Sequence, residues 1–140
     1  MDEDERSEPR SAEPSLHSIK VVGPCKAGKS TLVRGLQRLG YNARVCAQEH
    51  SEVPTMWQRV APARWLIYLD VSLESVRRRS PRSDWTPEVL EAQRRRLAHA
   101  RRHSHLIVGT DELTEAEVLE RVHQFLQAQG VRRIRPAEGE

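Results

Sequence analysis

The amino-acid sequence predicts an α/β fold, a three-layer sandwich around a mostly parallel sheet of four to five strands. Short apolar runs alternate along the chain with longer segments that have the apolar spacing of amphipathic helices. One of these runs, WLIYL at residues 65–69, is apolar throughout, which is typical of a strand covered on both faces of a parallel sheet. The chain of 140 residues is long enough for one domain with a hydrophobic core and too short for two ordinary domains.

The first half of the chain carries two predicted strands, at residues 18–22 and 43–47, and one helix, at residues 29–39. The strand at 18–22 is a short apolar run that Gly23 and Pro24 end. Leucines recur on one face of the helix, and Gly40 ends it. Arg44 interrupts the second run, and a loop that contains Pro54 follows it.

The second half adds two predicted strands, at residues 65–69 and 105–108, and three helices, at 72–79, 86–103 and from 114 to just before 130. Ser72 can cap the first of these helices. Thr86 and Pro87 open the second, because proline is tolerated in the first turn of a helix. Thr114 and Glu117 have the spacing of a capping box at the start of the third. The apolar residues expected on its buried side are Val118, Val122, Phe125 and Leu126.

Residues 18–130 form the predicted domain, and the segments on either side of it have a different composition. Residues 1–17 hold six acidic and two basic side chains without the apolar region of a secretion signal, so we expect a disordered acidic tail. Residues 131–140 are expected to form a flexible tail. No apolar stretch approaches the roughly 20 residues of a membrane span. The two cysteines, Cys25 and Cys46, form no disulfide framework, which favours a cytoplasmic location.

The most specific feature is GPCKAGKS at residues 23–30, which has the spacing G-x-x-x-x-G-K-[ST] of a phosphate-binding loop. It falls between a predicted strand and a predicted helix. Glycines in such a loop let backbone N–H groups point at phosphate oxygens, and the amino end of the helix adds partial positive charge. The spacing therefore predicts that a nucleoside triphosphate is bound by nine consecutive residues: Gly23, Pro24, Cys25, Lys26, Ala27, Gly28, Lys29, Ser30 and Thr31.

Three of these residues have an expected role. Lys29 reaches the β- and γ-phosphates, the hydroxyl of Ser30 ligates Mg²⁺, and Thr31 contacts the α-phosphate. Phosphoryl transfer also needs an acidic residue beside the metal or the nucleophile. Two acidic residues follow predicted strands and are candidates for this role, Glu49 and Asp70.

The phosphate loop, WLIYLDV at residues 65–71 and HLIVGTDELT at residues 105–114 together resemble the kinase-like group of P-loop NTPases. This group holds nucleoside, nucleotide, gluconate and adenylylsulfate kinases. The resemblance covers roughly residues 18–128 and implies the P-loop NTPase fold. It also implies binding of ATP with Mg²⁺ and phosphoryl transfer to a small metabolite or nucleotide. Such kinases have five core strands and this chain supplies four, so it resembles a small, trimmed member.

The resemblance also implies roles for residues outside the loop. In that group an arginine-bearing lid follows the strand that resembles WLIYLDV and closes on the phosphates. The lid candidates are Arg77, Arg78, Arg79 and Arg82, of which Arg78 and Arg82 are expected to be catalytic together with Lys29 and Glu49. The resemblance favours Glu49 over Asp70 as the acid beside the metal, with Asp70 as a cap of the turn at Ser72. The turn at residues 109–111 resembles the segment that touches adenine.

Two other functions remain open from the sequence. A nucleotide-dependent switch or slow ATPase could act through a protein partner, although the chain has no N-K-x-D or D-x-x-G motif of a GTPase. Binding of nucleic acid is ranked last. Nine of the twenty arginines lie between Arg77 and Arg102, but aromatic residues are few, no base-reading motif is present, and the acidic tail competes.

Overall fold

The computed structural model describes residues 15–59, 63–80 and 84–139. It confirms an α/β fold in which four parallel strands form one sheet in the order β2-β1-β3-β4. The strands are β1 (Ser18–Val22), β2 (Asn42–Val45), β3 (Trp65–Asp70) and β4 (Leu106–Gly109). The helices are α2 (Lys29–Arg38), the 3₁₀ helix η2 (Gln48–His50), α3 (Met56–Arg59), α4 (Leu73–Arg79), α5 (Pro87–Arg102) and α6 (Glu115–Ala128).

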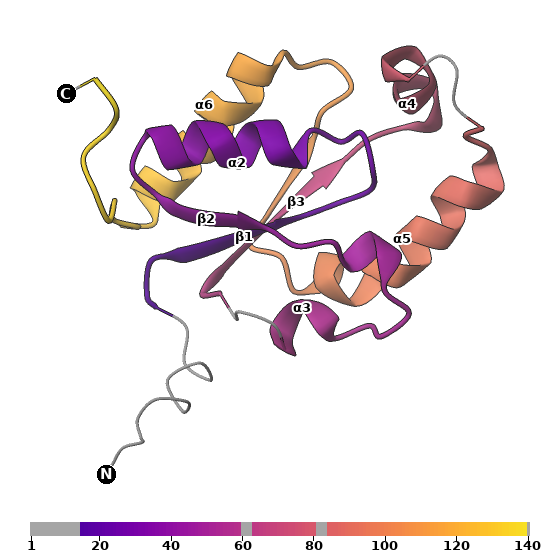
Figure 1. Cartoon of the computed structure of the whole chain (residues 1–140), viewed down its shortest axis with the longest axis horizontal. Coiled ribbons are helices and arrows are strands. Elements are labelled where there is room, and N and C mark those ends of the chain that lie inside the picture. The colour runs from indigo at the N-terminus through magenta and orange to yellow at the C-terminus, as the bar shows by residue number, and fades with distance from the viewer. Residues whose placement is uncertain (1–14, 60–62, 81–83, 140) are drawn as a thin grey trace, which may run out of the picture.

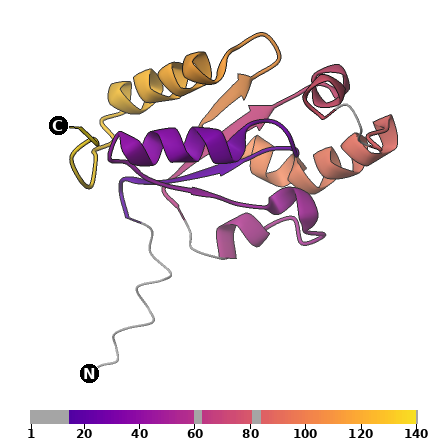
Figure 2. The same cartoon turned by 45° about the horizontal axis from the view of Figure 1, so that its top comes forward.

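Helices flank the sheet on both faces. Figure 1 shows α2 and α6 side by side over one face, with α3 and α5 over the other, and the turned view in Figure 2 shows the same arrangement. The short helix α4 follows β3 at the carboxyl edge of the sheet (Figure 1). This arrangement matches the predicted alternation of strands and helices, because each crossover between parallel strands carries a helix onto a face of the sheet.

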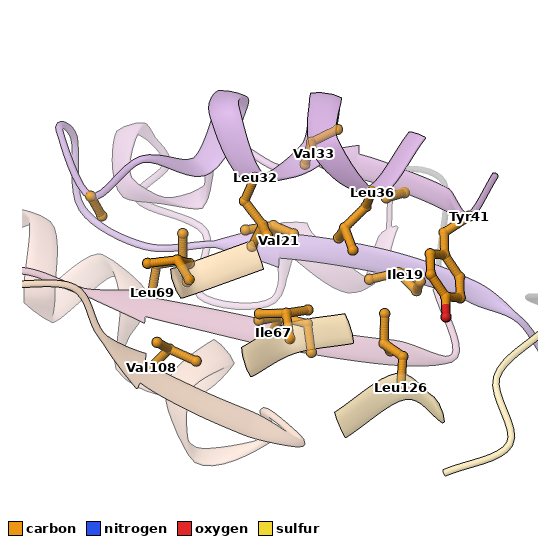
Figure 3. Packing of buried hydrophobic residues seen from close by; sticks show 14 of the residues in the cluster. Ile19, Val21, Leu32, Val33, Leu36, Tyr41, Ile67, Leu69, Val108 and Leu126 are labelled. Atoms are coloured by element: carbon orange, nitrogen blue, oxygen red, sulfur yellow. The ribbon is translucent and has the colours of Figure 1, made fainter. Parts of the chain in front are cut away.

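The core under α2 and α6 is built by alternate residues of the two central strands. Ile19 and Val21 of β1 and Ile67 and Leu69 of β3 all point to this face, where each is at most 1% exposed. Leucines of α2 pack onto them, as Figure 3 shows for Leu32 and Leu36. Burying one such side chain contributes about 1.5–3 kcal/mol, so this layer anchors α2 firmly to the sheet.

The opposite faces of the same strands pack under α3 and α5. Leu66 and Tyr68 of β3 lie there with Trp57 and Leu97, which explains why the run in β3 is apolar throughout. Lys20 of β1 also lies on this side and is 3% exposed, although the sequence predicts an apolar strand. Its ammonium donates a hydrogen bond to the carbonyl of Trp57 at 2.8 Å, and burial lowers the pKa of Lys20.

The main difference from the predicted elements lies between β2 and β3. The strand predicted at residues 43–47 begins one residue earlier, at Asn42, and ends at Val45. The segment predicted as a loop contains η2 and α3. The side-chain amide of Gln48 holds these turns: it accepts the N–H of Trp57 at 2.8 Å and donates to the carbonyl of Val53 at 2.9 Å. It also makes a tertiary contact, to the carbonyl of Arg96 in α5 at 3.2 Å.

The predicted helix starts are confirmed by their caps. The hydroxyl of Ser72 accepts the N–H of Ser75, and that of Thr86 accepts the N–H of Val89. Thr114 and Glu117 form the complete capping box at the start of α6. The apolar side of α6 is buried at Val118, Val122 and Leu126, whereas Phe125 is only partly buried.

Segments next to the predicted domain contact its body. The carbonyl of Leu16 accepts the N–H of the Trp65 indole at 3.0 Å, and residues 1–14 of the predicted acidic tail lie outside the described residues. On the C-terminal side, the backbone N–H groups of Ile134 and Glu138 donate to the carbonyls of Gly40 and Arg38. Within the described residues, no helix is long and apolar enough to cross a membrane.

The imidazole of His105 is expected to make the stability of the fold depend on pH. Its Nδ1 accepts the N–H of Leu66 at 3.0 Å, and burial together with the charge of Arg64 lowers the pKa of His105. The unfolded chain therefore takes up this proton first, near the ordinary value of about 6.5. We expect the free energy of unfolding to fall as the pH drops from about 7 towards 5.

His105→Asn should reduce this loss of stability, because an amide oxygen can replace Nδ1 as the acceptor and does not titrate. Denaturant unfolding of the wild type and the variant at several pH values measures the difference. Equal losses in the two proteins would contradict the role given to His105.

Candidate functional site

The carboxyl ends of the four parallel strands bring four connecting segments to one edge of the sheet. These segments are the phosphate-loop sequence after β1, η2 after β2, the start of α4 after β3, and the turn at residues 109–114 after β4. β1 lies between β2 and β3, so its loop has a neighbour on each side. In α/β sheets this edge is where ligands bind, at the point where neighbouring connections leave in opposite directions.

The loop backbone depends on glycine at two positions. Gly23 has φ +153°, and a Cβ there would collide with the carbonyl oxygen of Leu69 in β3. Gly28 has φ +99° and serves as the N-cap of α2. No side chain caps α2 within the described residues, and its first turn holds no acidic residue. The amino end of α2 therefore presents backbone donors and partial positive charge to the loop.

The ammonium group of Lys29 lies at the centre of the loop. Its ammonium donates hydrogen bonds to the carbonyls of Gly23 at 2.9 Å and Pro24 at 3.0 Å. It also pairs with Glu49 at 2.9 Å between Nζ and Oε2, with the two side chains 9% and 5% exposed. Lys29 and Glu49, which are both expected from the sequence to be catalytic, thus form a buried ion pair at the centre of the loop.

Glu49 is positioned by η2, directly after β2. Its backbone carbonyl accepts a hydrogen bond from Arg96 of α5 at 3.3 Å. Its Oε1 atom is buried and has no hydrogen-bond partner among the described residues. A buried carboxylate oxygen without a donor costs free energy, and a cation or a donor group that enters the site would satisfy it.

Gln93 of α5 holds the outer side of the loop, and nothing in the sequence singles it out. Its side-chain oxygen accepts the N–H of Cys25 at 3.0 Å, and its amide nitrogen donates to the Cys25 sulfur at 3.3 Å. Gln93 is 5% exposed. A polar residue on the inner face of an amphipathic helix is the only sequence signal that could have pointed to it.

Arg79 is the described lid candidate that contacts the loop. Its guanidinium donates to the carbonyl of Lys26 at 2.7 Å and to the carbonyl of Thr110 at 2.8 Å. The hydroxyl of Thr110 in turn donates to the carbonyl of Asp70 at 3.0 Å. Arg79 therefore fixes the end of α4 between the phosphate-loop sequence and the turn after β4.

The other predicted lid arginines are placed differently. Arg78 contacts two residues of its own helix, the hydroxyl of Ser75 at 3.0 Å and the carboxylate of Glu74 at 3.6 Å. Arg77 donates to the carbonyl of Trp85. Arg82 lies outside the described residues.

Asp111 takes the role expected of Asp70, as the cap of the turn at Ser72. Asp70 accepts the N–H of Val71 at 3.0 Å and lies 3.6 Å from Arg94, and it is Asp111 that accepts the N–H of Ser72 at 3.0 Å. Burial opposes ionisation of Asp111, but hydrogen bonds from Ser72 and Ser75 outweigh it and lower the pKa of Asp111. Asp111 thus ties the turn after β4 to the start of α4.

A cavity of about 340 Å³ opens beside the loop. The residues that line it come from the loop, α2, α4, the turn after β4 and α6: Lys26, Ala27, Gly28, Thr31, Leu32, Arg79, Thr110, Leu113, Glu115 and Val118. Its size is within the usual range for small-molecule sites, and backbone groups and polar side chains mix with an apolar wall. The cavity therefore joins the amino end of α2 to the predicted adenine-side turn.

A scan against models of known protein families finds no match to this chain, and a search of curated proteins finds no relative. The chemistry of the site must accordingly be inferred from its own residues.

Proposed function

We propose that the chain binds a nucleoside triphosphate through residues 23–31 and acts as a kinase-like phosphotransferase of the P-loop type. One observation carries the proposal: the buried ammonium of Lys29 lies at the centre of the loop, in front of an uncapped helix end, and pairs with Glu49. Structural ion pairs are rarely buried this deeply, because desolvation of two charges costs several kcal/mol. Phosphate oxygens that replace this carboxylate as the partner of Lys29 would explain why the pair is buried.

The contacts of Lys29 support this proposal. Its ammonium is held by two carbonyls and one carboxylate oxygen, all acceptors that phosphate oxygens can replace. The N–H groups at the start of α2 supply further donors, and the helix dipole favours the same negative charge. Binding therefore needs the side chain of Lys29 to turn from Glu49 towards the phosphates.

The residues present also fit Mg²⁺. This ion takes oxygen ligands, and the site offers the hydroxyl of Ser30 in the first turn of α2 and the carboxylate of Glu49. Glu49 has one buried oxygen without a partner among the described residues, which suits a cation. When bound, Mg²⁺ would neutralise charge on the phosphate oxygens.

The nucleoside is proposed to lie in the cavity beside the loop. Its wall combines the turn at Thr110 with the apolar side chains Leu32, Leu113 and Val118. An aromatic base can pack on such a wall while backbone groups of the turn read its edge. The absence of an N-K-x-D motif favours adenine over guanine.

Arg79 is proposed to stabilise charge during transfer. It bridges Lys26 of the loop and Thr110 of the turn, so its guanidinium stands where the phosphates and the nucleoside would meet. The acceptor is a small metabolite or nucleotide on the side of Glu49. This carboxylate can orient an attacking hydroxyl once Lys29 has turned to the phosphates.

Removal of the Lys29 charge should weaken this binding. Lys29→Ala is expected to weaken the binding of ATP with Mg²⁺ by about tenfold to a hundredfold, since a hydrogen bond from a charged donor contributes about 1.5–3 kcal/mol. Calorimetric titration or ligand-induced thermal stabilisation measures the change.

Lys29→Ala/Glu49→Gln provides the control, because it leaves no unpaired carboxylate in the site and should fold at least as well as the single variant. Its ATP affinity should be as low as that of Lys29→Ala. Failure of the wild-type protein to bind any nucleoside triphosphate at about 1 mM would overturn the proposal.

Turnover depends on the carboxylate of Glu49 in this mechanism. Glu49→Gln should retain ATP binding, because its amide oxygen can still ligate Mg²⁺, and lose about a hundredfold or more in the rate at which the γ-phosphoryl group is transferred or released. Glu52→Gln is the matched control, because Glu52 lies three residues away and its carboxylate is 82% exposed.

ATP labelled on the γ-phosphate distinguishes the reactions. Label in an added acceptor identifies a kinase, whereas acceptor-independent phosphate release, raised by a protein partner, identifies the switch or ATPase. Unchanged turnover in Glu49→Gln would contradict the role of this residue.

A further inference from the structure

We propose that Cys25, Glu49 and His50 form a binding site for a thiophilic divalent cation, with Zn²⁺ as the best-fitting ion. The site lies on the outer side of the phosphate loop and shares Glu49 with Lys29. Cation binding follows from these three side chains alone. Its effect on nucleotide binding rests on the function proposed above.

The three donor atoms have the spacing that one tetrahedral ion requires. The sulfur of Cys25 lies 3.5 Å from Nε2 of His50 and 3.8 Å from Oε2 of Glu49. Nε2 and Oε2 are 3.6 Å apart. Zinc bonds of about 2.3 Å to sulfur and about 2.0–2.2 Å to nitrogen and oxygen give tetrahedral edges of about 3.4–3.6 Å. The three donor atoms are therefore close to the separations of a tetrahedral zinc site, and small side-chain movements would bring them to those separations.

The donor set selects the kind of ion. A thiolate, an imidazole and a carboxylate suit zinc and related transition metals, whereas Mg²⁺ prefers oxygen donors only. Three protein ligands leave a fourth position of the tetrahedron for water or another ligand. The site thus has the composition of an exchangeable or regulatory centre, which differs from the four protein ligands of structural zinc sites.

The surroundings of the triangle support ligation. Gln93 donates its amide N–H to the Cys25 sulfur at 3.3 Å and fixes the backbone of Cys25 through its oxygen. Such outer contacts orient a metal ligand. The second oxygen of Glu49 is buried and unpartnered among the described residues, and the His50 side chain is 61% exposed, which provides an entry path.

Lys29 and the cation compete for the same carboxylate. Oε2 of Glu49 accepts the ammonium at 2.9 Å and is also the oxygen nearest to Cys25 and His50. A cation at the triangle repels the ammonium, while the thiol proton of Cys25 leaves to solvent as the metal–sulfur bond forms. Zn²⁺ therefore withdraws Glu49 from the Mg²⁺ position proposed above, and for this reason it should antagonise binding of the nucleotide with Mg²⁺.

Metal titrations of the full-length protein test the site. The protein is kept reduced with a phosphine and titrated with Zn²⁺ against a chromophoric chelator. The wild type should bind one ion, and both Cys25→Ser and His50→Ala should weaken binding by about a hundredfold or more, beyond the effect of losing an outer partner. His50→Ala replaces an exposed side chain and should leave the fold intact, and Cys46→Ser and His103→Ala are controls that should match the wild type.

Cobalt gives a readout of the ligands themselves. Co²⁺ bound to the wild type should show a sulfur-to-metal charge-transfer band that Cys25→Ser lacks and Cys46→Ser retains. A wild type that takes no Zn²⁺ from the chelator, or an affinity that Cys25→Ser leaves unchanged, overturns the proposed site.

Two further measurements separate this proposal from the proposed function. Lys29→Ala should bind Zn²⁺ at least as tightly as the wild type, although it binds ATP more weakly. Zn²⁺ should lower the ATP affinity of the wild type about tenfold or more and leave that of His50→Ala unchanged. Zn²⁺ binding without ATP binding in any variant would refute the nucleotide function alone, and ATP binding without Zn²⁺ binding would refute the metal site alone.

Discussion

The buried ion pair between Lys29 and Glu49 is the interaction on which the candidate site depends. It joins the start of α2 to η2, and through the carbonyls of Gly23 and Pro24 it also sets the centre of the loop. Taking two charges out of water costs several kcal/mol, so such a pair is weak evidence for stability. Its position in front of an uncapped helix end favours a role in ligand binding.

Strand order makes this pair possible. β1 lies between β2 and β3, so the loop after β1 faces Glu49 on one side and the β3 carbonyl of Leu69 on the other. The close approach to Leu69 admits only glycine at position 23. Contacts from α4 and α5, through Arg79 and Gln93, then fix two adjacent residues of the same loop, Lys26 and Cys25. Gly23, Arg79 and Gln93 therefore fix the loop against β3, α4 and α5, respectively.

Local signals in the sequence predicted most of the fold, and tertiary contacts account for what they missed. The strands and the caps at Ser72, Thr86 and Thr114 follow from apolar runs and from short-range hydrogen bonds. The turns η2 and α3 depend on Gln48, whose partners lie up to 48 residues away, so no local pattern could reveal them.

The residues of the candidate site also differ in how far the sequence could indicate them. The loop motif and Glu49 could be named from spacing and resemblance, because strand ends meet at one edge of a parallel sheet. The choice among the arginines after β3 could not be predicted, since the last turn of α4 sets which side chain faces the loop. Of the arginines that the structure describes there, it is Arg79. The meeting of Cys25 with His50, 25 positions apart, likewise depends on tertiary structure.

The central claim is that this edge of the sheet holds a nucleoside triphosphate, and amide chemical shifts during titration with ATP and Mg²⁺ test it most directly. The account predicts saturable shifts that are largest at residues 26–31 and at Thr110, around the cavity beside the loop. A second cavity, of about 520 Å³, is lined by Tyr68, Asp70, Glu91, Arg94, Ala98, Arg101 and Arg102. Shifts confined to those residues, or no shifts at about 1 mM ATP, would contradict the account.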